Sequence, residues 1–357
     1  MGEVVRGGVH QAEQPIRRLA LLLLVALGPA QAQTLQELAA YQGADRQQRL
    51  LAGAKKEGAL LFYTTFPTEY ANQLTAPFER RYGIKVSHWR SRSEIVLQKA
   101  LAEGRAGSST ADVITIISPQ AEILRRANLL QEVHSPYHAD LVPFAAPRHG
   151  EWAATLQHVF VQAYNTDQVK RDALPKTWAD LLAPRWKGKL AIESDDHEWL
   201  SSVIADMGQA EGVKFFRQLV ATNGVSVRSG HALLTSLVAS GEVPLALTVY
   251  QYSVEQAKKK GSPIDWFVIG PAVSITNAAA VPKKAPHPYA ALLFYDYLIS
   301  PEGQRAFAGI GYVPTSVKVE SPVKGVKLKL LDVPTLLDEQ ETSSRLFEQL
   351  ILKGAAR

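Results

Sequence analysis

The amino-acid sequence predicts an α/β protein built from two lobes. Segments with the hydrophobic pattern of β-strands alternate with helix-like segments along most of the chain, and this alternation is typical of layered α/β domains. The alternation begins again near residue 158, which indicates a second lobe of the same kind. A chain of 357 residues, 46% of them hydrophobic, is also long enough to bury two cores.

The first half of the chain is expected to hold helices and strands in turn. Gly58 and Gly83 follow helical segments and are typical of helix ends. Ser91 and Glu94 have the spacing of a capping box, and Pro119 suits the first position of a helix. The expected helices are 45–56, 68–82, 91–103 and one from Pro119, and the expected strands are 59–66, 84–90 and 112–117.

The second half repeats the pattern. A short helix capped at Thr177 is expected to stop at Pro184, before a buried strand. The expected strands are 158–164, 189–192, 224–228, 243–250, 264–269 and 273–281, and the expected helices are 196–207, 211–222, 231–239, one from Ser300-Pro301, and 342–352. We predict a signal peptide at 1–32, the first part of lobe 1 at 33–158, lobe 2 at 159–270, and a return to lobe 1 with C-terminal helices at 271–357.

The N-terminus has the pattern of a cleaved export signal. Arg17 and Arg18 precede a short apolar run, and small residues ending in Ala32 follow it as a cleavage site would. The apolar run is too short to cross a bilayer as a helix. We predict cleavage after Ala32 and a periplasmic location, and the alternative is a buried N-terminal helix.

The composition excludes several classes of site. The chain has no cysteine, so disulfides, thiolate metal sites, cysteine nucleophiles and a lipoprotein anchor are excluded. The formal net charge is +5 and the basic residues are scattered, so no nucleic-acid partner is expected. The chain contains no G-x-S-x-G, H-E-x-x-H or P-loop motif, and we expect neither catalytic residues nor a cofactor.

Candidate ligand-binding residues follow the ends of the expected strands. Ligands of α/β sheets bind beyond the carboxyl ends of the strands. Positions of this kind come from both halves of the chain, as a cleft between two lobes requires. They are Thr64, Thr65, Ser91, Arg92, Ser93, Ser118, Glu193, Asp195, Trp199, Arg228, Ser229, Gly230, His231, Tyr250 and Tyr252.

Two of these groups have the chemistry of an anion site. Arg92 and Arg228 each lie beside a hydroxyl residue near the start of a predicted helix, where free backbone N–H groups favour an anion. A guanidinium group also binds carboxylate or phosphate in a bidentate manner. The alternative is that each segment only caps its helix and that its arginine is solvated.

An acidic group follows the strand 189–192. Glu193, Asp195 and Asp196 are candidates to help bind a cation. Glu193 is expected to lie in the cleft, because helix capping does not explain it. Asp195 has a capping alternative, since Asp195 and Glu198 have the spacing of a capping-box variant. Trp199 follows within one turn and is expected to form an apolar wall.

The segment 175–193, PKTWADLLAPRWKGKLAIE, resembles the W-x-D-L-L-x-P-x-W-K-G-K signature of bacterial extracellular solute-binding proteins, in the branch that includes the ferric-iron binders. Segments 241–252 and 286–314 carry the same resemblance. The family implies the type II periplasmic-binding fold, with a mixed sheet flanked by helices in each lobe and a ligand cleft between them. It also implies a monomer that captures a ligand and docks on the permease of an ABC importer.

Tyr250 and Tyr252 lie where the ferric-iron binders of this family carry adjacent tyrosines. The resemblance implies that Tyr250, Tyr252 and Glu193 are metal ligands if the solute is Fe³⁺, because hard cations prefer oxygen ligands. Gln251 departs from the family pattern, although residues i and i+2 of an extended chain share a face. The alternative is one tyrosine in the core and one in the cleft wall.

The expected function is that of a periplasmic substrate-binding protein of an ABC uptake transporter. The two arginine segments favour a small anion or organic acid as the ligand. Ferric iron is the alternative ligand, and a periplasmic sensory or scaffold protein is the alternative of another class. An enzyme is not expected.

Overall fold

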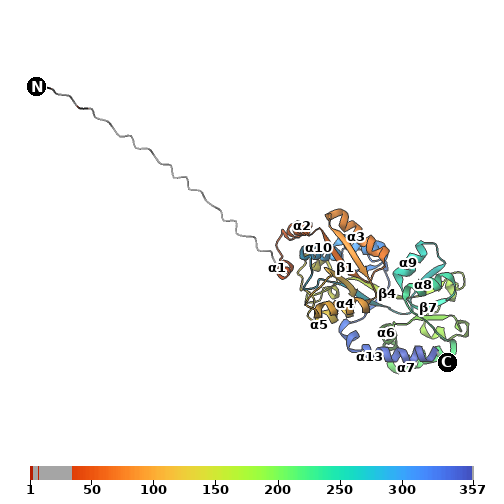
Figure 1. The fold of residues 1–357 in the computed structure, drawn as a ribbon. Coiled ribbons are helices and arrows are strands. Elements are labelled where there is room, and N and C mark those ends of the chain that lie inside the picture. Colours follow the sequence, from red (N-terminus) through yellow and green to blue (C-terminus); the bar gives the residue numbers. More distant parts are fainter. Residues whose placement is uncertain (3–6, 8–33, 356–357) are drawn as a thin grey trace. The chain divides into compact units, whose positions relative to one another are not determined.

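A computed structural model describes residues 1–2, 7 and 34–355 of the chain (Figure 1). The predicted signal peptide and its cleavage site lie almost entirely outside these residues. Met1–Gln33 and Thr34–Arg357 form separate units, and the fold belongs to the second. Among the described residues, no helix has the length and apolar character needed to cross a membrane.

Within the described residues, one sheet of eleven strands runs through both halves of the fold. Its order is β2-β1-β3-β9-β4-β7-β5-β6, with β8 and β10 paired to β4 and β11 paired to β9. β1 pairs in parallel with β2 and β3, and β5 pairs in parallel with β6 and β7, so each half has its own parallel group. The strands are β1 (Ala59–Thr64), β2 (Lys85–Arg90), β3 (Val113–Ile117), β4 (Ala153–Asn165), β5 (Leu190–Glu193), β6 (Ser226–Arg228), β7 (Leu245–Tyr250), β8 (Ile264–Phe267), β9 (Ala272–Ala280), β10 (Val313–Pro314) and β11 (Leu328–Leu330).

The long strands β4 and β9 join the two parallel groups and bring their carboxyl ends together. β9 lies antiparallel between β3 and β4, and β7 pairs antiparallel with β4. Ile117 at the end of β3 is opposite Asn277, which in turn is opposite Leu156 of β4. Tyr250 at the end of β7 is opposite Phe160 of β4. The carboxyl ends of both groups therefore meet along one short stretch of β4, and the carboxyl ends of strands are where α/β sheets bind ligands.

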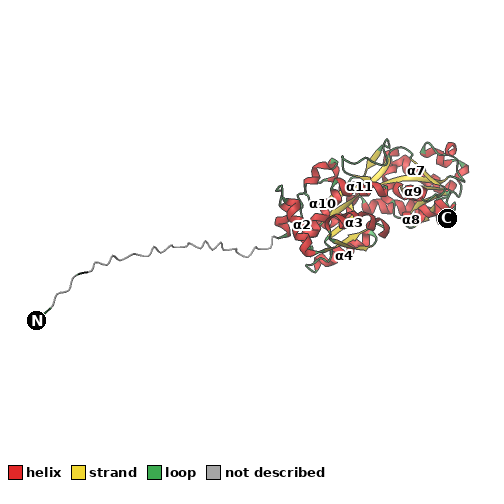
Figure 2. Ribbon diagram, turned by 90° about the horizontal axis from the view of Figure 1, so that it is seen from above, coloured by secondary structure: helices red, strands yellow, loops and turns green. Residues whose placement is uncertain are grey.

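Helices flank the strands of each half (Figure 2). Gly58 and Gly83 end α2 and α3 in the left-handed conformation, with φ of 76° and 71°, as the sequence predicted. The helices are α1 (Leu35–Ala40), α2 (Arg46–Glu57), α3 (Thr68–Tyr82), α4 (Ser93–Arg105), α5 (Ser118–Arg126), α6 (His197–Met207), α7 (Gln209–Asn223), α8 (His231–Ser240), α9 (Gln251–Lys259), α10 (Pro288–Ile299), α11 (Pro301–Ile310), α12 (Val333–Asp338), α13 (Gln340–Phe347) and α14 (Lys353–Ala355). Short 3-10 turns lie at Pro136–Asp140, Pro143–Ala145, Arg171–Ala173, Trp178–Leu182 and Pro184–Trp186, and a π turn lies at Glu348–Leu352.

The start of α4 differs from the sequence prediction. The helix begins at Ser93 with Arg92 as its N-cap and no side-chain capping bond, so the predicted capping box from Ser91 to Glu94 is wrong. The reason lies in the preceding strand. The Ser91 N–H donates to the Thr64 carbonyl of β1 at 3.1 Å, which continues the ladder between β1 and β2 past the last strand residue. The helix therefore starts later than expected.

Each half encloses its own hydrophobic cluster. The first cluster packs around β1 and β3 and includes the buried rings of Phe62, Phe78 and Phe294. It draws on residues 38–156 and again on 278–312, so the chain leaves this half and returns to it. The second cluster packs around β5 and β7 and is built from residues 160–275 together with 331–351.

Candidate functional site

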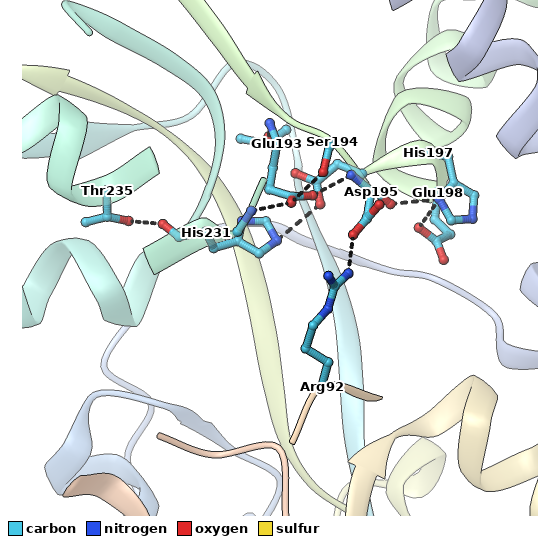
Figure 3. Close-up of polar contacts among 11 residues, drawn as sticks. Arg92, Glu193, Ser194, Asp195, His197, Glu198, His231 and Thr235 are labelled. Carbon is cyan, nitrogen blue, oxygen red and sulfur yellow. Dashed lines mark hydrogen bonds and ion pairs between the residues drawn. The ribbon is translucent and has the colours of Figure 1, made fainter. Parts of the chain in front are cut away.

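Glu193 lies at the centre of the candidate site (Figure 3). It is the last residue of β5 and is 3% exposed. Its Oε2 accepts a hydrogen bond from the Asp195 N–H at 2.6 Å. Its Oε1 accepts hydrogen bonds from the Gly230 N–H at 2.7 Å and from the Ser194 hydroxyl at 3.1 Å. The loops that follow β5 and β6 therefore fold onto one carboxylate.

Asp196 and His231 form a compact group with Glu193. His231 Nε2 lies 3.2 Å from Asp196 Oδ1, and one ligating atom from each of the three residues lies within 4.8 Å of the others. Asp196 is 3% exposed, and its Oδ2 has no hydrogen-bond partner among the described residues; the same is true of His231 Nδ1. Burying a carboxylate oxygen without a partner costs folding free energy, so this oxygen is a candidate contact for a ligand or an ordered water.

Aromatic rings from three segments lie next to this group. Tyr250 has its ring centroid 3.8 Å from that of His231 and 4.7 Å from that of His158. Tyr252 stacks beyond Tyr250, with ring centroids 5.9 Å apart and ring planes at 20°. The Tyr312 ring centroid is 4.3 Å from that of Tyr252. The site thus offers phenol and imidazole groups beside carboxylates.

The two predicted tyrosines come together by a route that the sequence did not predict. An extended chain was expected to place Tyr250 and Tyr252 on one face. Instead β7 ends at Tyr250 and α9 begins at Gln251. The first turn of α9 buries Gln251, which is 2% exposed, and still leaves the two tyrosine rings stacked.

Burial and neighbouring charges change the proton affinities in the site. Burial raises the pKa of the Glu193 carboxyl, and the charge of Asp196 raises it further. Burial acts to lower the pKa of His231, but the charge and hydrogen bond of Asp196 outweigh it, so this pKa is raised. The pKa of Tyr250 is raised well above its usual value by burial and by Asp196. Burial lowers the pKa of His158 to about 3, which keeps this imidazole neutral.

The arginines of the two predicted anion segments have partners within the protein. Arg92 Nη2 lies 2.9 Å from Asp195 Oδ2, and both side chains are 62% exposed. Figure 3 shows Arg92 reaching Asp195 from the other half of the fold. The Arg228 guanidinium donates to the Val227 carbonyl at 3.0 Å. The N-cap of α6 is Asp196, so Asp195 does not cap that helix and its side chain contacts Arg92 instead.

The hydroxyl residues predicted from the first half bond to neighbouring strands. Their partners lie on β3 and β9, so these hydroxyls help to join strands of the sheet. The pairs are Thr64 with Thr115 at 2.9 Å, Thr65 with Asn277 at 3.3 Å, and Ser118 with Thr276 at 2.6 Å. Ser91 and Ser93 are half-buried at the start of α4, and Ser229 is exposed.

Trp199 is a core residue, so its predicted role as an apolar wall is wrong. It is 1% exposed and packs against Trp178 and Phe216, with ring centroids 5.6 Å and 6.2 Å away. The reason is the orientation of α6, which begins at His197 and turns this face toward the second hydrophobic cluster.

Sequence reasoning did not select His158 or Tyr312, and it named Asp196 only as part of the acidic group that could help to bind a cation. Asp196 was visible within the acidic segment, but nothing in the pattern showed that it, rather than Asp195, is the buried member of the pair. His158 lies in the middle of β4 and Tyr312 lies just before β10. His158 opens a predicted strand and Tyr312 lies in no predicted element, and local patterns do not show the pairing across the sheet that brings them near Tyr250 and Tyr252.

A cavity of about 430 Å³ borders the aromatic side of the site. Its lining includes Tyr252 of α9 and Tyr70 of α3, whose ring centroids are 6.2 Å apart. Glu69 and Gln256 add polar groups to the lining. The cavity therefore takes its walls from helices of both halves and offers space next to Tyr252.

Comparison with protein families gives one match over most of the chain. The family described as bacterial extracellular solute-binding protein matches residues 73–329. The major ferric iron-binding protein of Neisseria meningitidis serogroup A is 27% identical over 305 residues, covering 80% of this chain and 90% of the relative. The Fe(3+)-binding periplasmic protein of Serratia marcescens is 24% identical over 290 residues, covering 78% of this chain and 85% of the relative.

Solved structures show the same fold. Iron-bound HitA from Pseudomonas aeruginosa matches with a TM-score of 0.70 and 24% identity, covering 82% of this chain and 99% of that one. The periplasmic binding protein AfuA from Actinobacillus pleuropneumoniae, with exogenous fructose-6-phosphate bound, matches with a TM-score of 0.71 and 21% identity, covering 83% of this chain and 99% of that one. These likenesses confirm the predicted fold class, α/β with two lobes of the type II periplasmic-binding kind.

Proposed function

The chain belongs to the family of bacterial extracellular solute-binding proteins, and from that premise we propose that it captures a hard metal cation, with ferric ion as the leading candidate, for an ABC importer. The family consists of binding and transport proteins, and its members work with ABC permeases. We propose that this chain is a monomer without enzymatic activity or a nucleic-acid partner. Its export signal, 1–32, would be removed in the periplasm. The first lobe would begin and resume as expected from the sequence, but the segment 331–351 would belong to the second lobe, because it packs into that half's hydrophobic cluster.

Asp196 Oδ2, which has no hydrogen-bond partner among residues 34–355, carries this proposal. It is buried beside Glu193, His231 and the phenol-bearing Tyr250. Oxygen-rich groups of this kind suit a hard cation, which would supply the partner that the buried carboxylate lacks. Closure of the two lobes about β4 and β9 would then bring Tyr70 and the first half against the bound ion.

The relatives support a ferric ion as the solute. Both curated relatives are named for ferric iron, and one structural neighbour is an iron-bound protein. The adjacent tyrosines that the family resemblance implies are replaced here by the stacked rings of Tyr250 and Tyr252, which are not neighbours in the sequence. Tyr250 and Tyr252, with Glu193, remain the predicted ligands, and Asp196 and His231 join them in this proposal.

A small anion is the second candidate solute. The sugar phosphate bound to a structural neighbour favours it, as does the exposure of Arg92 beside Asp195. An anion would have to draw the Arg92 guanidinium from Asp195, because the two groups form an ion pair at 2.9 Å. The cost is small, since exposed ion pairs contribute roughly 0–1 kcal/mol.

A ferric titration of wild type and Tyr250→Phe tests the cation proposal. Wild type is expected to develop the visible absorbance of a tyrosinate bound to ferric ion. Tyr250→Phe keeps the ring that packs on His231 but lacks the phenol oxygen, so it should lose most of this band. Its affinity should fall by about 100-fold or more, because even the loss of an outer-shell partner costs about 10–100-fold. Tyr82→Phe, remote from the site, is the control. A colourless wild-type protein would contradict the proposal.

Affinity for the cation is expected to rise with pH. The pKa values of the Glu193 carboxyl and the Tyr250 phenol are raised, so protons compete with a cation for both groups up to a higher pH than usual. Affinity should therefore fall as the pH is lowered, by about tenfold per pH unit for each displaced proton. Chelator-buffered ferric titrations across the pH range measure this slope. Tyr250→Phe should reduce the slope by about one proton, and an unchanged slope would count against phenolate ligation.

A further inference from the structure

Two loops of the second half point backbone N–H groups at the same place. The Asp195 N–H lies in the loop before α6, and the Gly230 N–H lies at the N-cap of α8. Gly230 has a φ of 101°, which a residue with a side chain rarely adopts, and this conformation turns its N–H inward. N–H groups at helix N-termini attract anions, because the helix dipole and the free donors act together.

The protein itself supplies the anion at this place. Both N–H groups donate to the Glu193 carboxylate, at 2.6 Å from Asp195 and 2.7 Å from Gly230. The Ser194 hydroxyl adds a third donor at 3.1 Å. Glu193 is 3% exposed, so the two loops enclose a carboxylate that is covalently part of β5. Oε1 accepts two of these hydrogen bonds and Oε2 accepts only one, so Oε2 still has a lone pair to offer a cation.

We propose that Glu193 is a built-in anion that determines the charge of the solute. Its carboxylate occupies the place at which the Asp195 and Gly230 N–H groups would otherwise bind an anion. The site therefore accepts a cation without a separate anion, and anionic solutes are excluded from these two N–H groups. This inference rests on the proposed function, because it names what selects for a cation at the same site. It makes Glu193 a specificity-determining residue as well as a neighbour of the bound ion.

The surroundings of Glu193 add to this selection. Asp196 places a second buried carboxylate beside it, so an anion from solvent would meet two like charges. The Arg228 guanidinium donates to the Val227 carbonyl at 3.0 Å and forms no ion pair with either carboxylate in the described part of the chain. Without the Glu193 carboxylate, the two loops are therefore expected to bind an anion instead of excluding it, because two backbone donors become free and one negative charge is removed.

Glu193→Ala tests the inference with inorganic phosphate as the probe, in titrations at constant ionic strength followed by calorimetry. Wild type is expected to show no saturable binding at roughly 10 mM phosphate, whereas the variant should bind with a dissociation constant of about 1 mM. Acetate should also restore part of the ferric affinity that Glu193→Ala loses, since a free carboxylate can enter the vacated position. Glu193→Gln fills the position with a neutral group and should gain neither phosphate binding nor acetate rescue.

A folded Glu193→Ala protein that binds phosphate no better than wild type would overturn the inference, and so would a wild-type protein that binds phosphate equally well. Glu193→Ser provides a second small side chain if the alanine variant does not fold.

In wild type, the amide resonances of Asp195 and Gly230 should not move when phosphate is added, and large shifts would also overturn the inference. The phosphate assay needs no iron. A wild type that fails to bind ferric ion therefore counts against the proposed function alone.

Discussion

Asp196→Asn is expected to lower the affinity for ferric ion by about 100-fold or more, while the protein stays folded. The substitution keeps the size of the side chain and removes the charge that faces Glu193 and His231. The buried Oδ2 of Asp196 has no partner in the described part of the chain, so the fold does not depend on that oxygen. The same variant should lower the pKa of His231, since the charge and hydrogen bond of Asp196 are the largest of the causes that raise it. Ferric titration and an NMR titration of His231 measure the two effects.

Asp195→Asn is the matched control for this result. It changes the same chemical group one residue earlier, in a side chain that is 62% exposed and paired with Arg92. Because exposed ion pairs contribute roughly 0–1 kcal/mol, ferric affinity should change by less than about fivefold. If both variants lost the same amount of ferric affinity, the ion would be held by the overall negative charge of this segment rather than by the buried carboxylate of Asp196.

Trp199→Ala is expected to lower the free energy of unfolding by about 3–5 kcal/mol, the usual cost of truncating a buried aromatic side chain. Trp199 packs on Trp178 and Phe216 in the second hydrophobic cluster. In domains of 150–250 residues, about 2–4 °C of melting temperature correspond to each kcal/mol, so a decrease of roughly 6–20 °C is expected. Thermal and urea unfolding of the ligand-free protein measure it.

Trp199→Phe is the control for the size of the cavity that truncation of Trp199 would leave in the hydrophobic cluster. It keeps an aromatic ring in the same place and should lose clearly less stability than Trp199→Ala. Ferric affinity measured below the melting transition should change little in either variant, because Trp199 faces the core. A stable Trp199→Ala protein with weakened affinity would restore the role that the sequence suggested for this residue, an apolar wall of the site.

The site residues that could be predicted are those whose position depends on a single strand end. Glu193 closes β5 and Tyr250 closes β7, and both lie beside the group that surrounds Asp196. His231 and Gly230 follow β6 in the same way. Strand ends can be read from hydrophobic runs and glycines, and in α/β sheets the carboxyl ends gather at one place.

The residues that could not be predicted depend on loop geometry or on distant pairing. Asp195 and Asp196 are neighbours of the same type, and only the path of the loop decides which one is buried. Arg92 and Arg228 each follow a strand and precede a helix. Arg92 nevertheless forms an ion pair with Asp195 of the other half, whereas Arg228 donates to the backbone carbonyl of its neighbour Val227. Side-chain partners of this kind are set by three-dimensional proximity, which local patterns do not contain.

The divided hydrophobic clusters have a consequence for the order of folding. The first cluster needs residues 278–312, and the second needs residues 331–351, before either is complete. The first half therefore cannot complete its core before residue 312 has been synthesised, nor the second half before residue 351. Contacts between such distant segments also close large loops, which slows folding relative to proteins with local contacts. The nascent chain is therefore expected to remain without a complete hydrophobic core until synthesis is nearly finished. Both halves are then expected to fold late, in one concerted step.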